Sequence, residues 1–361
     1  MIVYVGTNTG PGKAEGIGVF RLDESTGALS HVQTVPAENP TWVTLDPQER
    51  FLYTGTRTMQ ATSGPVNSSI EAYAIDQGTG TLSFVNRQPS GGNGPAYVSV
   101  HPSGRCVFAA NYGSGHVAAL PVGQDGRLGE PGSVIHHEGR GHHARRQEAS
   151  HAHSVATDPS GQYVLACDLG VDRVFVYKVD PETAQLTPND LPYAQLPSGA
   201  GPRHFAFDPT GRFVFVNGEM SSTVTAFAFD PERGAMQVTD TYSTVPEDVD
   251  PRAINNSTAQ VLVHPNGRFV YVSNRGHDTI AVFAFDAERG RLSPRGHVST
   301  QGKTPRNFNI HPNGKLLLAG NQDTHTIVAF SVDGESGVLT PTGQVTQTPA
   351  PICIQFSQVG G

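Results

Sequence analysis

Residues 203–229 read RHFAFDPTGRFVFVNGEMSSTVTAFAF, and this stretch indicates how the whole chain folds. Residues 203–207 form a short apolar run. The next four residues, Asp-Pro-Thr-Gly, form a turn, because proline fixes φ and glycine tolerates positive φ. Residues 212–216 then return antiparallel, and residues 223–229 alternate with a period of two, as in strands that bury one face. With an edge strand expected near residues 236–242, the stretch predicts a four-stranded antiparallel unit.

The same pattern recurs along the chain at intervals of about fifty residues, a spacing typical of propeller repeats. In each repeat a strand led by proline is followed by Asp-Pro or His-Pro, an aromatic-rich strand, a polar turn and two more strands. The anchor dipeptides are Asp46-Pro47, His101-Pro102, Asp158-Pro159, Asp208-Pro209, His264-Pro265 and His311-Pro312.

The two ends of the chain each supply part of one more unit. Residues 2–34 contain three strands without the proline-led first strand, and residues 351–356 contain that strand alone. Pairing them closes a ring of seven units and covers its edges. The sequence therefore predicts an all-β, seven-bladed β-propeller of four-stranded antiparallel blades, in a single domain over residues 1–361. An open solenoid is the alternative, but it requires capping repeats and does not explain the divided unit.

Composition limits the class of partner. A formal net charge of −8 argues against nucleic acid or an anionic membrane as a partner. The sequence enters an apparent strand at once and has no apolar run of the roughly 20 residues that span a bilayer. Three cysteines, Cys106, Cys167 and Cys353, lie far apart in strand-like segments, as expected of reduced core thiols. We expect a cytoplasmic protein, a monomer or weak homo-oligomer, in which an anionic substrate requires a local positive pocket.

A loop rich in histidine and arginine precedes Asp158. Its histidines His136, His137, His142 and His143 lack the fixed spacing of a metal site. Residues of this kind usually lie exposed in such a loop. The sequence therefore predicts no metal and no cofactor, and it also lacks the Gly-x-Ser-x-Gly elbow of α/β serine esterases.

Two positions of the repeat are expected at one mouth of the central channel. The first strand of a propeller unit lines the channel and the second returns beside it, so the start of one and the end of the other reach the same face. Five residues before each anchor stand Thr41, Ala96, His153, Arg203, Ala259 and Arg306, with Ile352 equivalent in the closing strand. Eleven residues after the anchors stand Arg57, Tyr112, Leu169, Glu219, Arg275 and Gln322, and one residue earlier lie Asn111, Asp168, Asn274 and Asn321.

Charged residues gather at this mouth, where small or apolar residues would pack most simply. The set comprises His153, Arg203, Glu219, Arg275 and Arg306. Partly desolvated charges are costly unless they are paired or used. We interpret the set as one site, and the further expected substrate contacts are Arg57, Asn274, Asn321, Gln322 and His151. The structural alternative is an Arg–Glu network that ties the blades together, with His153 a hydrogen-bonded channel histidine.

The same motifs resemble those of a known family. Gly201-Pro202-Arg203-His204-Phe205, Ser273-Asn274-Arg275-Gly276, Thr304-Pro305-Arg306-Asn307-Phe308-Asn309 and residues 146–154 (RQEASHAHS) are similar to motifs of the seven-bladed propeller lactonase family. That family includes the bacterial propeller type of 6-phosphogluconolactonase and the fungal carboxymuconate lactonizing enzymes. The resemblance implies that the site residues are His153, Arg203, Glu219 and Arg275, with Arg306 in another motif. Where family members often have Asn, an acidic residue and His, this chain has Gly218, Gln260 and Leu262.

The resemblance implies lactone hydrolysis, which needs an activated water, a stabilised oxyanion and a grip on the substrate's anion. His153, with an ordinary pKa near ~6.5, suits a general base, and Glu219 can orient it or serve as the base itself. Arginine can stabilise the oxyanion or hold phosphate or carboxylate in a bidentate fork. The leading hypothesis is hydrolysis of 6-phosphogluconolactone. The alternatives are a carboxymuconate-type lactonizing enzyme and a non-catalytic propeller scaffold, which would display an apolar surface patch.

Overall fold

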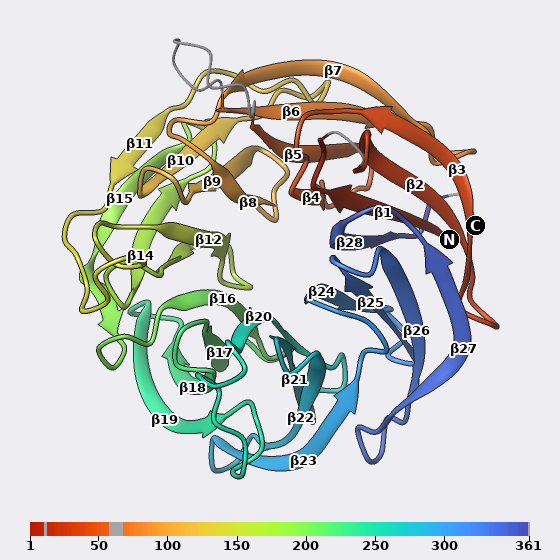
Figure 1. Ribbon diagram of the computed structural model, residues 1–361. Helices are drawn as coiled ribbons and strands as arrows, with labels where there is room; N and C mark the ends of the chain where they lie inside the picture. Colours follow the sequence, from red (N-terminus) through yellow and green to blue (C-terminus); the bar gives the residue numbers. More distant parts are fainter. Residues whose placement is uncertain (11–12, 58–67, 360–361) are drawn as a thin grey trace.

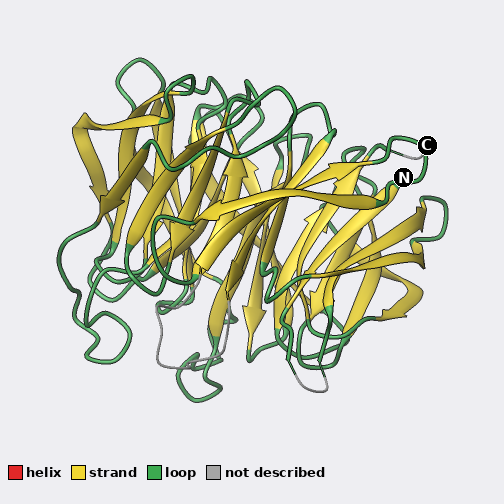
Figure 2. Cartoon of the chain, turned by 90° about the horizontal axis from the view of Figure 1, so that it is seen from above, coloured by secondary structure: helices red, strands yellow, loops and turns green. Residues whose placement is uncertain are grey.

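The computed structural model describes residues 1–10, 13–57 and 68–359, and these residues form seven four-stranded sheets arranged as blades of a ring (Figure 1). All neighbouring strands pair antiparallel. The strands run between two faces of the ring, where the loops gather (Figure 2). None of the described residues belongs to a helix long and apolar enough to cross a membrane. The predicted seven-bladed propeller is confirmed.

The first three blades are built as follows. Blade 1 consists of β28 (Pro351–Ser357), β1 (Ile2–Thr7), β2 (Gly16–Asp23) and β3 (Ala28–Pro36). Blade 2 consists of β4 (Trp42–Leu45), β5 (Phe51–Arg57), β6 (Ser68–Ile75) and β7 (Leu82–Pro89). Blade 3 consists of β8 (Pro95–Val100), β9 (Cys106–Asn111), β10 (His116–Pro121) and β11 (Ser133–His136).

The other four blades keep the same order from the axis outward. Blade 4 consists of β12 (Ala152–Thr157), β13 (Tyr163–Asp168), β14 (Arg173–Asp180) and β15 (Gln185–Gln195). Blade 5 consists of β16 (Pro202–Phe207), β17 (Phe213–Gly218), β18 (Thr223–Asp230) and β19 (Ala235–Ser243). Blade 6 consists of β20 (Ser257–Val263), β21 (Phe269–Arg275), β22 (Thr279–Asp286) and β23 (Arg291–Ser299). Blade 7 consists of β24 (Pro305–Ile310), β25 (Leu316–Asn321), β26 (Thr326–Val332) and β27 (Leu339–Gln347).

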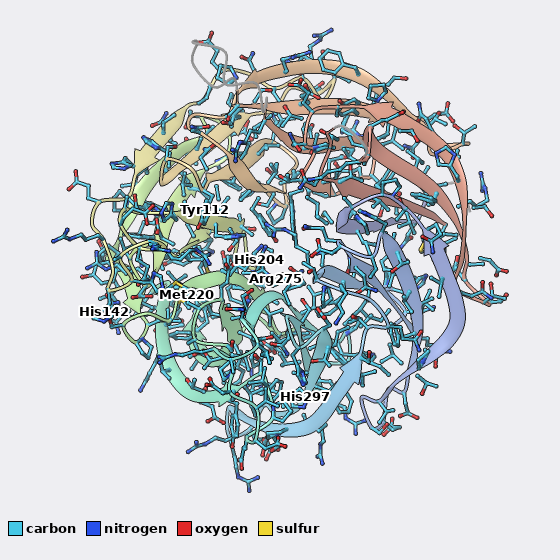
Figure 3. All side chains as sticks on the ribbon, in the orientation of Figure 1. Tyr112, His142, His204, Met220, Arg275 and His297 are labelled. Atoms are coloured by element: carbon cyan, nitrogen blue, oxygen red, sulfur yellow. The ribbon has the colours of Figure 1, made fainter. Side chains whose placement is uncertain are left out.

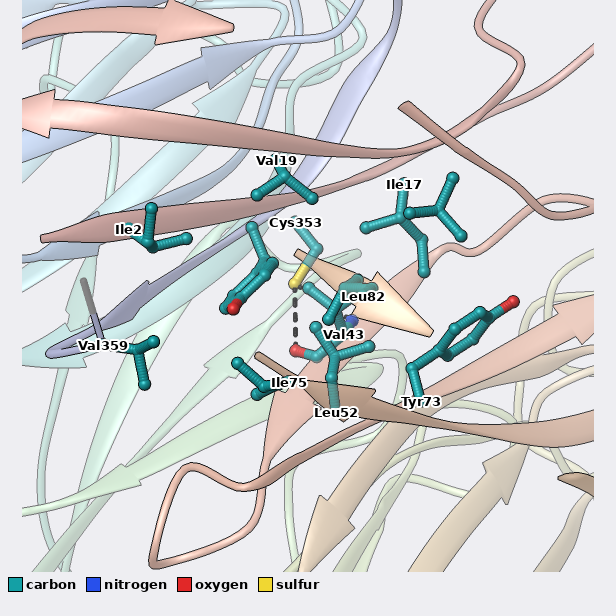
Figure 4. Close-up of a cluster of buried hydrophobic side chains, with 12 residues drawn as sticks. Ile2, Ile17, Val19, Val43, Leu52, Tyr73, Ile75, Leu82, Cys353 and Val359 are labelled. Carbon is teal, nitrogen blue, oxygen red and sulfur yellow. Dashed lines mark hydrogen bonds between the residues drawn. The ribbon is translucent and has the colours of Figure 1, made fainter. Parts of the chain in front are cut away.

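The ring closes in blade 1, where the carboxy-terminal strand β28 pairs with the amino-terminal strand β1, for example at Val5↔Ile354. In the apolar cluster between blades 1 and 2, Cys353 donates its thiol hydrogen to the Val43 carbonyl at 3.6 Å (Figure 4). The closing strand is therefore held both within its own sheet and against the next blade. The predicted closure by the two ends is confirmed.

The anchor Asp-Pro pairs form turns because the aspartate side chain satisfies the turn's backbone. Asp208 accepts hydrogen bonds from the backbone N–H of Phe213 at 2.8 Å and of Thr210 at 3.1 Å. A His anchor works between blades instead, since His101 Nε2 lies 2.9 Å from the Gly161 carbonyl of blade 4. Asp208 thus fixes the hairpin that joins the first and second strands of its own blade, whereas His101 ties its hairpin to the next blade.

The hydrophobic core lies between neighbouring blades. Between blades 6 and 7, Tyr271 packs with Phe308 and Phe330, all fully buried. Burying a side chain of this size stabilises the fold by about 1.5–3 kcal/mol. The Tyr271 hydroxyl also donates to the Gly337 carbonyl in an outer turn of blade 7, at 3.0 Å. Each blade therefore depends on its neighbours for burial, which keeps the inner strands in a fixed ring.

The inner strands are irregular where they begin. The ladder passes from Ala152↔Asp168 to Ser154↔Cys167, so His153 has no partner on β13. A β-bulge of this kind bends the strand and re-aims the extra side chain. The residues equivalent to His153 in blades 1, 3 and 7 stand in the same kind of bulge, and they are Ile352, Ala96 and Arg306. In blade 5 a wider irregularity places Arg203 and His204 opposite one residue, Asn217.

Candidate active site

A pocket of about 380 Å³ opens at one mouth of the channel. It is lined by residues from every blade and from the loop before β12, and they are Thr41, Trp42, Arg57, Gly94, Pro95, Ala96, Tyr112, Arg146, His153, Arg203, His204, Glu219, Arg275, Arg306 and Ile352. In Figure 3 the labelled side chains His204 and Arg275 lie close to the ring axis, whereas His142 lies near the perimeter. The two repeat positions predicted at the mouth do meet there.

Glu219 is the centre of the charge network. Its Oε2 lies 2.8 Å from Arg203 Nε and 3.0 Å from Arg275 Nη2, and Arg146 Nη2 donates to its Oε1 at 2.5 Å. The Arg203 contact is an ion pair without the alignment of a hydrogen bond. Burial alone raises the pKa of Glu219, but Arg275, Arg203, His153 and Arg146 outweigh burial and hold it well below its usual range. Glu219 is therefore an ionised hub that joins three arginines.

His153 faces this hub from its bulge on β12. Its Nε2 lies 3.9 Å from Glu219 Oε2, and its side chain is only 6 % exposed. Burial and then the charge of Arg203 lower the pKa of His153 well below 6.5, although Glu219 acts in the opposite direction. At neutral pH His153 is thus an uncharged imidazole that can accept a proton beside a carboxylate.

His204 occupies the other position of the blade 5 bulge and is fixed by Gln260. An amide oxygen only accepts hydrogen bonds, so His204 Nδ1 carries the proton that it shares with Gln260 Oε1 at 2.5 Å. Burial, followed by the charges of Arg203 and His153, lowers the pKa of His204 well below 6.5. The ring contacts Trp42 edge to face at a centroid distance of 5.0 Å. Gln260, one of the family departures, therefore holds a neutral histidine beside Arg203.

Arg146 belongs to the site although its position in the repeat gave no signal for it. It comes from the long loop before β12, and its side chain is 40 % exposed against 6 % for Glu219. Burial works against its charge, yet Glu219 raises the pKa of Arg146. Its neighbour Gln147 donates to the Leu169 carbonyl at 2.9 Å and to Asp172 at 2.7 Å, which fixes the loop on blade 4. Arg146 is the first residue of the family-like motif at residues 146–154, but the contact with Glu219 is what places it in the pocket.

The same loop corrects the expectation that His137 is exposed. His137 is 2 % exposed, and its Nδ1 lies 2.7 Å from Asp168 Oδ2, while its Nε2 lies 2.7 Å from the Tyr177 hydroxyl. Asp168 Oδ1 also accepts from the backbone N–H of His151 at 2.7 Å. One carboxylate therefore holds both ends of the loop that carries Arg146. The other three histidines, His136, His142 and His143, are exposed as predicted.

Asn274 and Asn321 do not reach the pocket. Successive strand residues point to opposite faces, so Asn274 points away from the mouth that Arg275 lines. Both asparagines are fully buried, and they donate to the Thr244 and Thr300 carbonyls at 2.6 and 2.9 Å. They tie each blade to the end of the preceding blade's outer strand. The spacing predicted the correct end of the strand but the wrong face for these two residues.

Two further predicted contacts, Gln322 and His151, lie outside the pocket lining. Gln322 is half-buried and donates to Asp323 at 3.0 Å. His151 stacks on Tyr112 at a ring-centroid distance of 4.6 Å, and its Nδ1 lies 2.9 Å from the Tyr112 carbonyl. His151 therefore supports a pocket residue from behind. Arg57 and Arg306 do line the pocket, as expected.

The pocket is strongly positive. Five guanidinium groups and one carboxylate line it, an excess of four positive charges, in a chain whose formal net charge is −8. Burial and then the nearby Arg275 lower the pKa of Arg306 to about 10, which leaves it charged at neutral pH. In the described part of the chain, no three His, Cys, Asp or Glu side chains are grouped to hold a metal ion. The arrangement is suited to a small anion that carries an electrophilic carbonyl.

Comparison with known proteins decides the family. A family model described as lactonase, 7-bladed β-propeller, matches residues 2–356. The chain belongs to this lactonase family. It is 38 % identical over 308 residues to the 6-phosphogluconolactonase of Bacillus subtilis, covering 85 % of this chain and 84 % of that protein. It is 30 % identical over 314 residues to the 6-phosphogluconolactonase of Formosa agariphila, covering 85 % of this chain and 86 % of that protein.

A solved structure of the lactonase family has the same architecture over nearly the whole chain. The periplasmic gluconolactonase of Pseudomonas aeruginosa superposes with a TM-score of 0.92 at 32 % sequence identity, covering 99 % of each chain. The structure shows the surroundings of the three positions at which this chain differs from many family members. Gln260 holds His204, and a Cβ atom at Gly218 would lie 2.9 Å from the Ala200 carbonyl oxygen and 2.3 Å from Ser221 Oγ. Leu262 is partly buried against the apolar cluster between blades 6 and 7.

Proposed function

We propose that this chain hydrolyses 6-phosphogluconolactone to 6-phosphogluconate. The observation that carries the proposal is the pairing of a neutral His153 with a positive pocket of about 380 Å³ in a member of the lactonase family. Pockets of ~300–1,000 Å³ are usual for small ligands. Membership of the lactonase family supports attack on a cyclic ester, and the excess of guanidinium groups supports a negatively charged one.

In the proposed reaction, water attacks the lactone carbonyl and passes a proton to His153 Nε2. The imidazolium formed is stabilised by Glu219, whose Oε2 lies 3.9 Å away. The negative charge on the carbonyl oxygen is met by guanidinium N–H groups of Arg203 or Arg275, which are already oriented by Glu219. Preorganised donors of this kind lower the barrier because no reorganisation is needed as charge develops. Collapse breaks the ring C–O bond, and His153 returns the proton to the ring oxygen.

His153 is a better base than Glu219 in this site. Each oxygen of Glu219 already contacts at least one guanidinium group, and its pKa lies well below the usual range because of those charges. A carboxylate so stabilised has little tendency to take a proton at neutral pH. His153 has no such partner at its Nδ1, which is buried without a hydrogen bond among the described residues. We therefore assign proton transfer to His153 and charge stabilisation to Glu219.

We also propose that the protein is cytoplasmic and is a monomer or weak homo-oligomer. Free, buried cysteines at Cys106, Cys167 and Cys353 support a reducing compartment such as the cytoplasm. Fractionation of the native organism, read with an antibody to this chain, tests the location. The proposed monomer or weak homo-oligomer is tested by sedimentation at several protein concentrations, where a constant dimeric or larger mass contradicts it.

The proposed reaction is tested by following 6-phosphogluconate formation with a coupled dehydrogenase. The lactone also opens spontaneously, so the rate is compared with a protein-free reaction at the same pH. A rate that rises in proportion to protein concentration supports the proposal. Equal rates with and without protein contradict it, and turnover of a carboxymuconate-type lactone alone would favour the lactonizing alternative.

A further inference from the structure

The five arginines of the pocket fall into two classes. Arg146, Arg203 and Arg275 each contact Glu219. Within residues 1–10, 13–57 and 68–359, the guanidinium groups of Arg57 and Arg306 have neither an ion-pair nor a hydrogen-bond partner, although both line the pocket. Arg306 is half-buried, and a guanidinium buried to this degree without a counter-ion is unfavourable by itself, whereas Arg57 is exposed. The second class is therefore suited to a negative group that the protein does not supply.

The two classes come from different blades, and they meet between blades 6 and 7, where Arg275 of the first class lies near Arg306 of the second. Glu219 and Arg203 belong to blade 5, and His153 belongs to blade 4. Arg306 stands in the bulge of β24 in blade 7, and Arg57 ends β5 in blade 2. These two blades flank blade 1, which lies across the ring from blades 4 and 5 (Figure 1). Among the described residues of blade 1, the apolar Ile352 alone lines the pocket.

The chemistry of a lactone limits which group of the substrate can bind Arg57 and Arg306. In the intact lactone the carboxyl group is tied up as a neutral ester, so it offers no anion to an arginine before the ring opens. Any negative charge on the substrate must therefore lie on a substituent away from the reacting carbonyl. A phosphate monoester carries about two negative charges and three acceptor oxygens at neutral pH, and it matches the planar fork of arginine.

We propose that Arg306 and Arg57, which come from the two blades beside blade 1, form a phosphate subsite, while the carbonyl is held near His153 of blade 4 and Arg203 of blade 5. This assignment rests on the proposed lactone hydrolysis. It separates the arginines that bind the substrate's fixed charge from those that meet the charge formed in the reaction. Loss of a subsite arginine should therefore change selectivity for the phosphate and leave hydrolysis of a neutral lactone intact.

The kinetic test compares 6-phosphogluconolactone with glucono-δ-lactone, which lacks the phosphate, in wild type, Arg306→Gln and Arg57→Gln. We expect kcat/KM for the phosphorylated lactone to fall by about 10- to 100-fold in Arg306→Gln, the loss expected for one charge-assisted contact. We expect a smaller fall in Arg57→Gln, because Arg57 is exposed. The value for the neutral lactone should stay within about twofold of wild type in both variants.

Lys303→Gln is the matched control, since Lys303 lies three residues before Arg306 in the bend that leads into β24, is 70 % exposed and lies outside the pocket. It removes a positive charge near the mouth without touching the subsite. Equal losses for the two lactones in Arg306→Gln, or a loss in Lys303→Gln as large as in Arg306→Gln, would overturn the subsite. No catalysis of either lactone by the wild type would overturn the proposed function instead.

A binding measurement keeps the subsite testable without turnover. Titration calorimetry of 6-phosphogluconate and gluconate into wild type and Arg306→Gln separates recognition from chemistry. We expect 6-phosphogluconate to bind the wild type at least about tenfold more tightly than it binds the variant, and gluconate to distinguish them little. Equal binding of 6-phosphogluconate to both proteins, or a variant that loses gluconate to the same degree, would contradict a phosphate subsite.

Discussion

Blades 4, 5 and 7 and blades 1 and 3 all begin their inner strands with a backbone irregularity, wider in blade 5, but they place different side chains there. The first group places His153, Arg203 and Arg306 in the pocket, whereas the second places Ile352 and Ala96 there. The bulge therefore supplies a position at the mouth, and the side chain supplies the chemistry.

The largest effect is expected from replacing Glu219, the carboxylate that contacts three arginines of the pocket. In Glu219→Gln, the buried Arg203 and the partly buried Arg275 lose the carboxylate that both contact. We expect the free energy of unfolding to fall by about 3–5 kcal/mol, as when one partner of a buried ion pair is removed. We expect kcat to fall by about 100- to 1,000-fold, because the guanidinium donors are no longer oriented. Urea denaturation and steady-state kinetics measure the two effects.

Glu148→Gln is the control for that experiment. Glu148 lies in the loop before β12 and is 53 % exposed, and its Oε1 lies 3.3 Å from His151 Nε2. Exposed pairs of this kind contribute about 0–1 kcal/mol, so both stability and kcat should stay near wild type. If Glu219→Gln were as stable and as active as Glu148→Gln, the hub would have no role.

A smaller effect is expected when the positive charge at residue 203 is kept but the geometry of its hydrogen-bond donors is changed. Arg203→Lys retains a cation in the blade 5 bulge and loses the planar fork. The fork lies close to both Glu219 Oε2 and the Ala259 carbonyl, and a single ammonium cannot meet both sets of acceptors equally. We expect kcat to fall by about 10- to 100-fold with a native circular dichroism spectrum. Unchanged kcat would show that charge alone suffices at this position.

The pH dependence of kcat/KM tests whether His153 is the general base. Burial and Arg203 disfavour the imidazolium and lower its pKa well below 6.5, so the neutral base is present throughout the neutral range and is lost as pH falls through the lowered value. We expect kcat/KM, corrected for spontaneous hydrolysis, to be flat at neutral pH and to fall only below pH ~6.5, the ordinary value for histidine. An acid limb centred at or above pH ~6.5 would contradict a desolvated base.

The smallest expected effect on activity is at a strand position that faces away from the mouth. Asn321→Ala removes the hydrogen bond to the Thr300 carbonyl. We expect the free energy of unfolding to fall by about 1–3 kcal/mol, because a buried acceptor is left unsatisfied, while KM and kcat stay within about twofold. A rise in KM without a loss of stability would instead place Asn321 against the substrate.

Much of the fold follows from the sequence because its signals are local and repeated. The Asp-Pro and His-Pro turns at positions such as Asp208 and His101 gave the period, and the divided unit at the two ends gave the number of blades and the closure. The same period gave the ends of strands that carry His153, Arg203, Glu219 and Arg275. These residues meet in the structure because every blade repeats the same distance from anchor to mouth.

Features that depend on local strand register or on contacts between distant residues could not be predicted from the sequence. Alternation turns Asn274 and Asn321 away from the mouth, although they neighbour mouth positions. No repeat position marks Arg146, because it reaches Glu219 from a loop whose course is fixed by Gln147. His137 is buried through a contact with Asp168, thirty-one residues away, which composition of the loop cannot reveal.

We propose above all that His153 transfers the proton, while residues of the other blades bind the substrate and stabilise the charge that forms. The most direct measurement is kcat for 6-phosphogluconolactone in His153→Asn, beside His142→Asn, an exposed histidine outside the pocket. We predict that kcat falls by about 100- to 10,000-fold in His153→Asn, the range for losing a general base, with KM little changed and with wild-type rates in His142→Asn. A His153→Asn variant that turns over as fast as the wild type would contradict the account.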